Sequence, residues 1–356
     1  MRSSSCDTEH RRSPIVVALL VVATASSACQ GKAKGKAEAE VEAESPAPLV
    51  TVREEAHMGT YVTVSVAAAE SKEVLAAIDA AFAEVRRAER LLSEWVQESD
   101  VSRVNQQAGS GAVEVGDELF GVIRLALEIS RVTDGAFDVS FAALGGLWDF
   151  KAAEPRVPTR EECEARTKLV GYRRVTLREG RRTVELQAAG MQLGLGGIAK
   201  GYIVDRASQT LKASGYPNHL VVAGGDGYAA GRRSDRKWRI AIRHPRDQSL
   251  YKSLEVEDQG FATSGNYEKF FIQDGVRYHH ILDPRTGMPA RGASSVSVIA
   301  ASAAEADAYA TALFVLGPQT GLALARKRGL AVLFFDDDYR TSASADIEQK
   351  LQPLPE

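Results

Sequence analysis

The chain has 356 residues, of which 44% are hydrophobic and 26% are charged, so it is long and apolar enough to bury a large globular core. Its formal net charge is −3, and basic pairs such as Arg181-Arg182 and Arg232-Arg233 stand alone, which excludes the basic stripe of a nucleic-acid-binding protein. Its three cysteines are scattered, which excludes a cysteine-rich zinc site.

The first 28 residues have the pattern of a signal peptide. Arginines precede the apolar run IVVALLVVATA, which is too short for a comfortable membrane span, and small residues then lead to Cys29. This order predicts export as a lipoprotein that is cut before Cys29 and lipidated there. A lipoprotein signal usually has Leu where Ser26 stands, so export with cleavage at a nearby small residue is the alternative.

Residues 29–48 would then be the lipidated cysteine and a flexible tether, because QGKAKGKAEAEVEAESPAP has no core-forming pattern. Cys6 falls in the discarded segment and Cys29 carries lipid, so Cys163 has no partner for an intrachain disulfide. The predicted location is the periplasmic face of the inner membrane, or the outer face of the cell membrane.

From residue 49 to about 340, hydrophobic periodicity predicts one α+β domain, followed by a tail over 341–356. Helices are predicted over 72–93, 117–132 and 198–213, with an amphipathic helix over 303–315 that ends at Gly-Pro and another over 318–328. Strands are predicted over 62–66, 220–223, 238–242, 295–299 and 331–335, and hairpins turn at Glu179-Gly180 and Asp274-Gly275. Hairpins mixed with helices favour α+β over a doubly wound parallel sheet.

The first candidate site is LGLGGIAKGYIVD (193–205), where glycines surround Lys200 at the start of a helix. A glycine-rich turn before a helix leaves N–H groups free for an anion, although the same turn also serves tight strand–helix packing. The segment is not a Walker A loop, because Lys200 is not followed by Ser or Thr.

Two further glycine-rich stretches follow. In VVAGGDGYAAG (221–231), the better interpretation of Asp226 is a carboxylate that accepts hydrogen bonds from neighbouring amides. In RYHHILDPRTGMPA (277–290), His279 and His280 face opposite sides of a strand, so only one of them points into a given cleft. Such a histidine is either a general base or, more often, a polar surface residue.

Asp307 and Thr311 lie four residues apart and share one helix face. A carboxylate and a hydroxyl placed together suit Mg²⁺, which prefers oxygen ligands and keeps few protein ones. The alternative is local: Asp307 serves its own helix N-terminus and Thr311 bonds back to a carbonyl.

Taken in order, these segments resemble the ApbE family of FAD:protein FMN transferases. The resembling stretches are HMGTYVTVSV, LLSEWVQESDVSRVNQ, DGAFDVSFAALGGLWDF, LGLGGIAKGYIVDRA, VVAGGDGYAAG, TSGNYEKFF, HHILDPRTGMP and EADAYATALFVLG, from about residue 57 to 317. The resemblance implies Mg²⁺-dependent cleavage of FAD, with transfer of FMN through a phosphoester to a Thr or Ser of a target protein and release of AMP. It also implies that the targets are membrane-facing subunits of redox-driven ion pumps.

Carried over by position, the resemblance implies roles for single residues. Asp307, Thr311 and the Gly197 carbonyl would hold Mg²⁺, and His280 is the candidate general base. The residues expected to contact FAD are Met58, Trp95, Ala136, Phe137, Asp138, Gly194, Lys200, His280 and Ile281.

Two departures affect this assignment. Relatives commonly carry Asp at the position of Gly194, where it holds part of the cofactor, and some carry a second acidic residue at the position of Ala310. The alternatives are an FAD pyrophosphatase, in which water replaces the acceptor hydroxyl, and a membrane-tethered flavin-binding lipoprotein without turnover.

Overall fold

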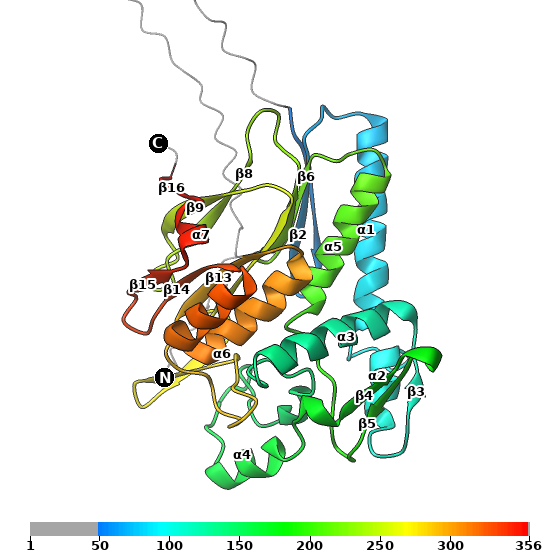
Figure 1. Cartoon of the computed structure of the whole chain (residues 1–356), viewed down its shortest axis with the longest axis vertical. Helices are drawn as coiled ribbons and strands as arrows, with labels where there is room; N and C mark the ends of the chain where they lie inside the picture. Colours follow the sequence, from blue (N-terminus) through cyan, green and yellow to red (C-terminus); the bar gives the residue numbers. More distant parts are fainter. Residues whose placement is uncertain (1–48, 355–356) are drawn as a thin grey trace, which may run out of the picture. The chain divides into compact units, whose positions relative to one another are not determined.

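The domain is built on an antiparallel sheet of eight strands (Figure 1). The computed structural model describes residues 49–354; the predicted signal peptide, Cys29 and the predicted tether lie outside them. Each strand of the sheet pairs antiparallel with its neighbours. In spatial order the strands are β1 (Thr51–His57), β2 (Thr60–Val66), β6 (His219–Ala223), β7 (Asp226–Ala230), β10 (Gln259–Gly265), β13 (Ser295–Ala300), β14 (Ala331–Phe335) and β15 (Thr341–Ala343).

Helices α1 (Lys72–Leu92), α5 (Ala199–Ala213) and α6 (Ala303–Arg328) pack around this sheet, and α1 lies beside α5 (Figure 1). The apolar residues of α1 recur at helical spacing and are buried, among them Ile78, Phe82 and Val85. The remaining helices of the first half are α2 (Asp100–Gln106), α3 (Asp117–Val132) and α4 (Arg160–Thr167). Mixed helices and antiparallel strands confirm the predicted α+β class.

The described residues also contain three smaller sheets. They are β3 (Val113–Glu114) with β5 (Thr183–Leu186) and β4 (Val175–Arg178), β11 (Phe270–Gln273) with β12 (Val276–His279), and β16 (Leu351–Gln352) with β9 (Leu250–Val256) and β8 (Trp238–Arg243). Both predicted hairpins form, as β4–β5 and β11–β12.

The predicted tail over 341–356 is placed differently by the structure. Strand β15 pairs with β14, α7 (Ala345–Glu348) follows it, and β16 pairs with β9. Residues 341–352 therefore belong to the folded domain, and the predicted boundary at 340 is too early. These strands are only two and three residues long, too short for a period to show in the sequence.

Helix α6 differs from the prediction in one respect. It breaks at Gly317, whose φ of 73° is left-handed, just before Pro318, so the predicted stop is confirmed. The predicted amphipathic character of its first half is wrong, because that half is buried on nearly every side. By length and composition α6 could cross a membrane, but its burial inside the domain is typical of a core helix.

Two glycines allow the N-terminus of α6 to approach its neighbours closely. A Cβ atom built at Gly201 on α5 would lie 2.2 Å from the carbonyl oxygen of Ala303, and one at Gly260 on β10 would lie 2.2 Å from the Ala303 nitrogen. No side chain fits at either position. The start of α6 is therefore held directly against the first turn of α5.

We expect Gly201→Ala to lower the free energy of unfolding by about 1–3 kcal/mol, because α5 and α6 must separate to admit the methyl group. The matched control is Gly121→Ala in α3, where an added Cβ meets nothing within 4 Å. That change should stabilise by about 0.5–1 kcal/mol, since alanine loses less backbone entropy. Urea denaturation of both variants measures the difference; a Gly201→Ala protein as stable as the parent would contradict the close packing.

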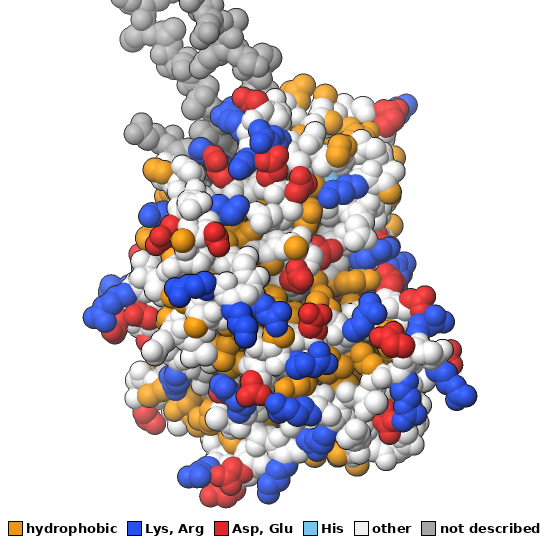
Figure 2. Space-filling model, in the orientation of Figure 1, with side chains coloured by type: hydrophobic (Ala, Val, Ile, Leu, Met, Phe, Trp, Pro, Cys, Tyr) orange, Lys and Arg blue, Asp and Glu red, His pale blue; other side chains and the backbone are white. Residues whose placement is uncertain are grey.

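The surface agrees with the modest net charge. On the face drawn in Figure 2, basic and acidic side chains are mixed, with apolar side chains between them. Many of the arginines pair with nearby carboxylates, such as Arg87 with Glu84 and Glu118. This face carries no continuous basic stripe.

Candidate active site

The glycine-rich segment 193–197 runs between two features that together make the candidate site. At one end, a Cβ built at Gly194 would lie 2.7 Å from the Phe141 ring, which lines an aromatic cavity. At the other end, a Cβ built at Gly197 would lie 3.3 Å from Thr311 Oγ1. An elongated ligand that follows this segment would therefore reach from the aromatic cavity to Thr311.

Beside Thr311 lies a cluster of three charged side chains: Lys200, Asp226 and Asp307. The Lys200 ammonium forms an ion pair with Asp226 Oδ2 and lies 3.7 Å from Asp307 Oδ1. Both carboxylates are buried, and burial raises the pKa of Asp307 while the Lys200 charge opposes that rise. Asp226 Oδ1 also accepts the Thr263 N–H at 3.2 Å, which confirms its predicted bonding to a neighbouring amide.

Asp307 is positioned by an exchange of caps between α5 and α6. Its Oδ2 accepts the N–H of Gly201 at 3.1 Å, at the start of α5. In return, Asp205 of α5 accepts the N–H groups of Ala303 and Ala304 at 2.8 and 2.9 Å, at the start of α6. Each helix thus supplies the carboxylate that satisfies the free N–H groups of the other.

This geometry decides between the two interpretations of Asp307 and Thr311. Asp307 serves the N-terminus of α5 rather than that of its own helix, where Ser302 is the N-cap. The Thr311 hydroxyl has one hydrogen-bond partner among residues 49–354, Ser264 Oγ at 3.5 Å, and makes no bond back to a helix carbonyl. The local alternative therefore does not describe this pair.

The residues of this corner fit a hard divalent cation. In a regular helix the Gly201 N–H would bond the carbonyl of Gly197, but here it donates to Asp307, and that carbonyl accepts no hydrogen bond from the described part of the chain. The donors are all oxygens: one buried carboxylate, one hydroxyl and one free carbonyl. Within residues 49–354 no group of three or more His, Cys, Asp or Glu is arranged to hold a metal ion, so substrate oxygens and water would have to complete the shell.

The predicted FAD-contacting loop 136–138 lies beside this corner through Phe137, whose ring carbon would lie 3.1 Å from a Cβ at Gly197. Ala136 and Phe137 are buried. Asp138 accepts hydrogen bonds from Ser140 N and Oγ at 2.8 and 2.6 Å and from Tyr172 N at 2.8 Å. Both of its carboxylate oxygens thus fix the loop, and its contact with FAD stays a prediction.

The two adjacent histidines have different surroundings. His279 Nε2 donates to the Ala290 carbonyl at 3.0 Å, and its ring meets Phe314 edge-on at 5.4 Å. In both rings Nδ1 is buried without a hydrogen bond, so this feature is common to His279 and His280. Burial lowers the pKa of His280 to about 4, helped by the positive charges of Lys269 and Lys200. His280 is therefore neutral at pH 7, and Lys200 is among the charges that act on it.

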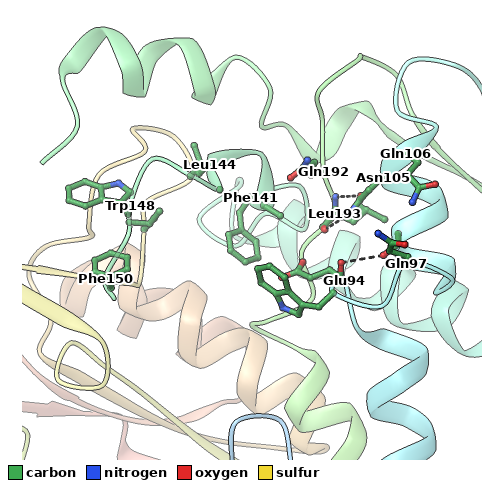
Figure 3. Close-up of a pocket in the computed structure, with 15 residues that line it drawn as sticks. Glu94, Gln97, Asn105, Gln106, Phe141, Leu144, Trp148, Phe150, Gln192 and Leu193 are labelled. Carbon is green, nitrogen blue, oxygen red and sulfur yellow. Dashed lines mark hydrogen bonds between the residues drawn. The ribbon is translucent and has the colours of Figure 1, made fainter. Parts of the chain in front are cut away.

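The aromatic cavity has a volume of about 440 Å³ (Figure 3). Phe141 lies between Trp148 and Phe150 on one side and Glu94 and Gln97 on the other (Figure 3). The other lining residues are Trp95, Ser102, Asn105, Gln106, Ala142, Leu144, Gly145, Gln192, Leu193 and Leu282. Trp95 is 88% exposed, so its indole is free to contact a ligand.

The remaining predicted residues are spread around these features. Met58 lies in the turn between β1 and β2, donates its N–H to Glu89 Oε1 at 2.8 Å and does not line the cavity with Trp95. Ile281 is buried next to Leu282, which does line it. At Gly194, Phe141 and Ala142 fill the place of a side chain, so the aspartate of relatives would not fit without moving Phe141.

Three parts of the site were not predicted from the sequence. The Lys200–Asp226 ion pair and the cap from Asp205 join residues 26 and 98 positions apart. The third is Glu94, next to Trp95 in the chain, which lines the cavity. Only for Glu94 was there a local signal, a charged residue next to an aromatic at the end of a helix.

Comparison with known proteins is consistent with this geometry. The model of the ApbE family matches residues 58–334. A protein of Treponema pallidum named FAD:protein FMN transferase is 36% identical over 321 residues, which cover 85% of this chain and 89% of that protein. One of the same name from Vibrio cholerae is 35% identical over 289 residues, covering 79% and 85%.

Solved structures agree in fold. An ApbE protein from Thermotoga maritima superimposes with a TM-score of 0.78 at 33% identity, covering 85% of this chain and 99% of that one. The apo form of a flavinyl transferase ApbE from Pseudomonas stutzeri gives a TM-score of 0.75 at 32% identity, covering 85% and 97%.

Proposed function

Because the chain belongs to the ApbE family of flavin transferases, we propose that it moves FMN from FAD to the hydroxyl of a Thr or Ser in an acceptor protein and releases AMP. One observation carries the proposal: a single glycine-rich segment joins an aromatic cavity to a corner where Asp307, Thr311 and a free Gly197 carbonyl meet. A dinucleotide needs both features in its binding site, because its rings require a pocket and its phosphates require a charged or metal-binding corner.

Each residue at the corner has a distinct task in this reaction. Asp307, Thr311 and the Gly197 carbonyl would hold Mg²⁺, which supplies charge neutralisation at the pyrophosphate. Lys200, one third exposed and paired with Asp226, lies where its ammonium can meet phosphate oxygens. Phosphoryl transfer depends mainly on such positioning and neutralisation.

The bonding changes assign a role to His280. The acceptor oxygen bonds to the phosphorus on the FMN side, the bond from that phosphorus to the AMP oxygen breaks, and the hydroxyl proton must go to a base. His280 is neutral at pH 7, and its Nδ1 is unpartnered. A bound pyrophosphate would raise its pKa from about 4, because a nearby negative charge favours the imidazolium.

We expect His280→Ala to reduce FMN transfer by about 10²–10⁴-fold while FAD still binds. His279→Ala is the contrasting variant. It removes the bond to Ala290 and the packing on Phe314, so it should lower thermal stability more than it lowers the rate per folded molecule. Single-turnover transfer and thermal denaturation of both variants test this; an unaltered rate in His280→Ala would remove it from the mechanism.

The function itself is tested by incubating the protein with FAD and Mg²⁺ or EDTA, with or without a peptide that carries a Thr acceptor. An FMN-peptide and AMP, formed only with Mg²⁺, establish the transferase. AMP and free FMN formed regardless of peptide identify an FAD pyrophosphatase instead. If FAD stays intact under every condition, the protein is a flavin-binding protein without turnover.

We further propose that the enzyme works from a lipid anchor at Cys29 on the outer face of the membrane, where it modifies membrane-facing subunits of redox-driven ion pumps. This rests on the sequence pattern of residues 1–48. Mass spectrometry of the N-terminal peptide from membrane fractions tests it: a diacylglyceryl mass on Cys29 supports the anchor, and an unmodified, soluble chain refutes it.

A further inference from the structure

Glu94 is a partly buried acidic group that the proposed mechanism leaves without a task. It follows Ser93, the residue that ends α1, and it lines the aromatic cavity. Its Oε2 is shielded from solvent and has no hydrogen-bond partner among the described residues. The lining of the cavity includes no Lys, Arg or His, so no cationic side chain among residues 49–354 neutralises it there. Burial accordingly raises the pKa of Glu94.

The backbone of the Glu94 loop is firmly held, so the orientation of Glu94 is part of the fold. Ser102 Oγ donates to the Glu94 carbonyl at 3.2 Å, Ser99 Oγ donates to the Ser93 carbonyl at 2.7 Å, and the Trp95 N–H donates to Ser93 Oγ at 3.2 Å. Leaving a carboxylate oxygen buried and unpaired costs free energy, and a bound ligand with a donor at that point would recover it.

The surroundings of Glu94 define the chemistry of that donor. The cavity presents the rings of Trp95, Phe141, Trp148 and Phe150, which suits a flat aromatic ligand. Polar groups gather on the side of Glu94 and Gln97 (Figure 3). Asn105 is held by Leu193, because its Oδ1 accepts the Leu193 N–H at 2.7 Å and its Nδ2 donates to the Leu193 carbonyl at 3.1 Å, and it makes no hydrogen bond to Glu94 Oε2.

We propose that Glu94 is a specificity-determining residue, whose carboxylate accepts a hydrogen bond from an N–H group at the edge of a heteroaromatic ring system of FAD. This rests on the proposed function. FAD carries two such donors, the imide N–H of the flavin and the amino group of adenine. Either group could donate to Glu94 Oε2. FMN carries only the flavin imide and AMP carries only the adenine amino group.

The test measures binding of FAD, FMN and AMP to the parent, Glu94→Gln and Glu94→Leu by calorimetry. Hydrogen bonds to charged groups are strong, so we expect Glu94→Leu to weaken FAD binding by about 10- to 100-fold and Glu94→Gln by less. If FMN binding weakens together with FAD binding, the donor is on the flavin; if AMP binding weakens instead, the donor is on adenine. Glu98→Gln is the matched control, an exposed acid four residues away that should bind all three ligands like the parent.

A second readout separates a ligand-binding role from a structural one. Without ligand, Glu94→Leu and Glu94→Gln should have a higher Tm than the parent, because they remove a buried, unpaired carboxylate; a lower Tm would assign Glu94 to the fold and overturn the proposal. If the parent binds FAD and both variants match it within twofold, Glu94 has no part in binding. If the parent binds neither FAD nor its halves, the proposed function fails as well.

Discussion

Asp307→Asn is expected to reduce FAD cleavage by at least about 10³-fold and to abolish measurable Mg²⁺ binding at the site. Asparagine keeps an oxygen that can accept the Gly201 N–H, so the cap on α5 survives. What is lost is the only negative charge among the three proposed metal donors, and electrostatic stabilisation of developing charge is worth several kcal/mol.

The control is built into the exchange of caps. Asp205→Asn changes a partly buried carboxylate that caps α6 instead of α5, and it lies outside the proposed metal site. Burial raises the pKa of Asp205 to about 6, so this carboxyl is largely ionised at pH 7, and asparagine in its place keeps one oxygen that can accept an N–H at the start of α6.

Calorimetric titration with Mg²⁺ and AMP release from FAD should therefore separate the two variants: Asp205→Asn stays within a few-fold of the parent in both assays. Equal activity in the two would show that Asp307 is only a cap, and equal loss would show that the start of α6 matters more than the charge.

Much of the fold was predictable because its signals are local. The period of Ile78, Phe82 and Val85 marks α1, and Glu179-Gly180 and Asp274-Gly275 mark two hairpins, each within a window of a few residues. Burial on all sides of α6 was not visible in this way. Glu305, Asp307 and Thr311 interrupt its alanines and indicate a polar face, and the close contact with Gly201 and Gly260 comes from distant parts of the chain.

For the candidate site, too, the local relations were predictable and the long-range ones were not. Asp307 and Thr311 could be paired from their spacing, because a helix sets their relation. Lys200 could be placed at a helix start, but its partner Asp226 lies on β7 and is brought there by the pairing of β7 with β6 and β10. Glu94 could not be distinguished from a surface acid, since burial of one carboxylate oxygen is a property of the assembled cavity.

Lys200→Met is expected to lower the free energy of unfolding by about 3 kcal/mol, measured in urea without Mg²⁺. It leaves the buried carboxylates of Asp226 and Asp307 without a counter-charge, and an unpaired buried charge is costly. Lys212→Met on the same helix is the control; Lys212 lies 4.9 Å from the centre of the Tyr228 ring, and its loss should cost only about 0.5–1 kcal/mol.

A double-mutant cycle shows whether Lys200 acts through Asp226. In Lys200→Met/Asp226→Asn the second change removes one stranded charge, so the double variant should be more stable than the sum of the single losses predicts, by at least about 1 kcal/mol. Additive losses would mean that the ion pair contributes nothing beyond its separate parts.

The same variant links stability to the proposed metal site. Without Mg²⁺, Lys200 is the cation beside Asp307. Removing it leaves a carboxylate whose charge Mg²⁺ could neutralise, and a ligand that binds only the folded state stabilises it. Added Mg²⁺ should therefore restore part of the stability of Lys200→Met and much less in the double variant with Asp307→Asn. If Mg²⁺ leaves Lys200→Met unchanged, then Asp307, Thr311 and the Gly197 carbonyl do not form a metal site without substrate.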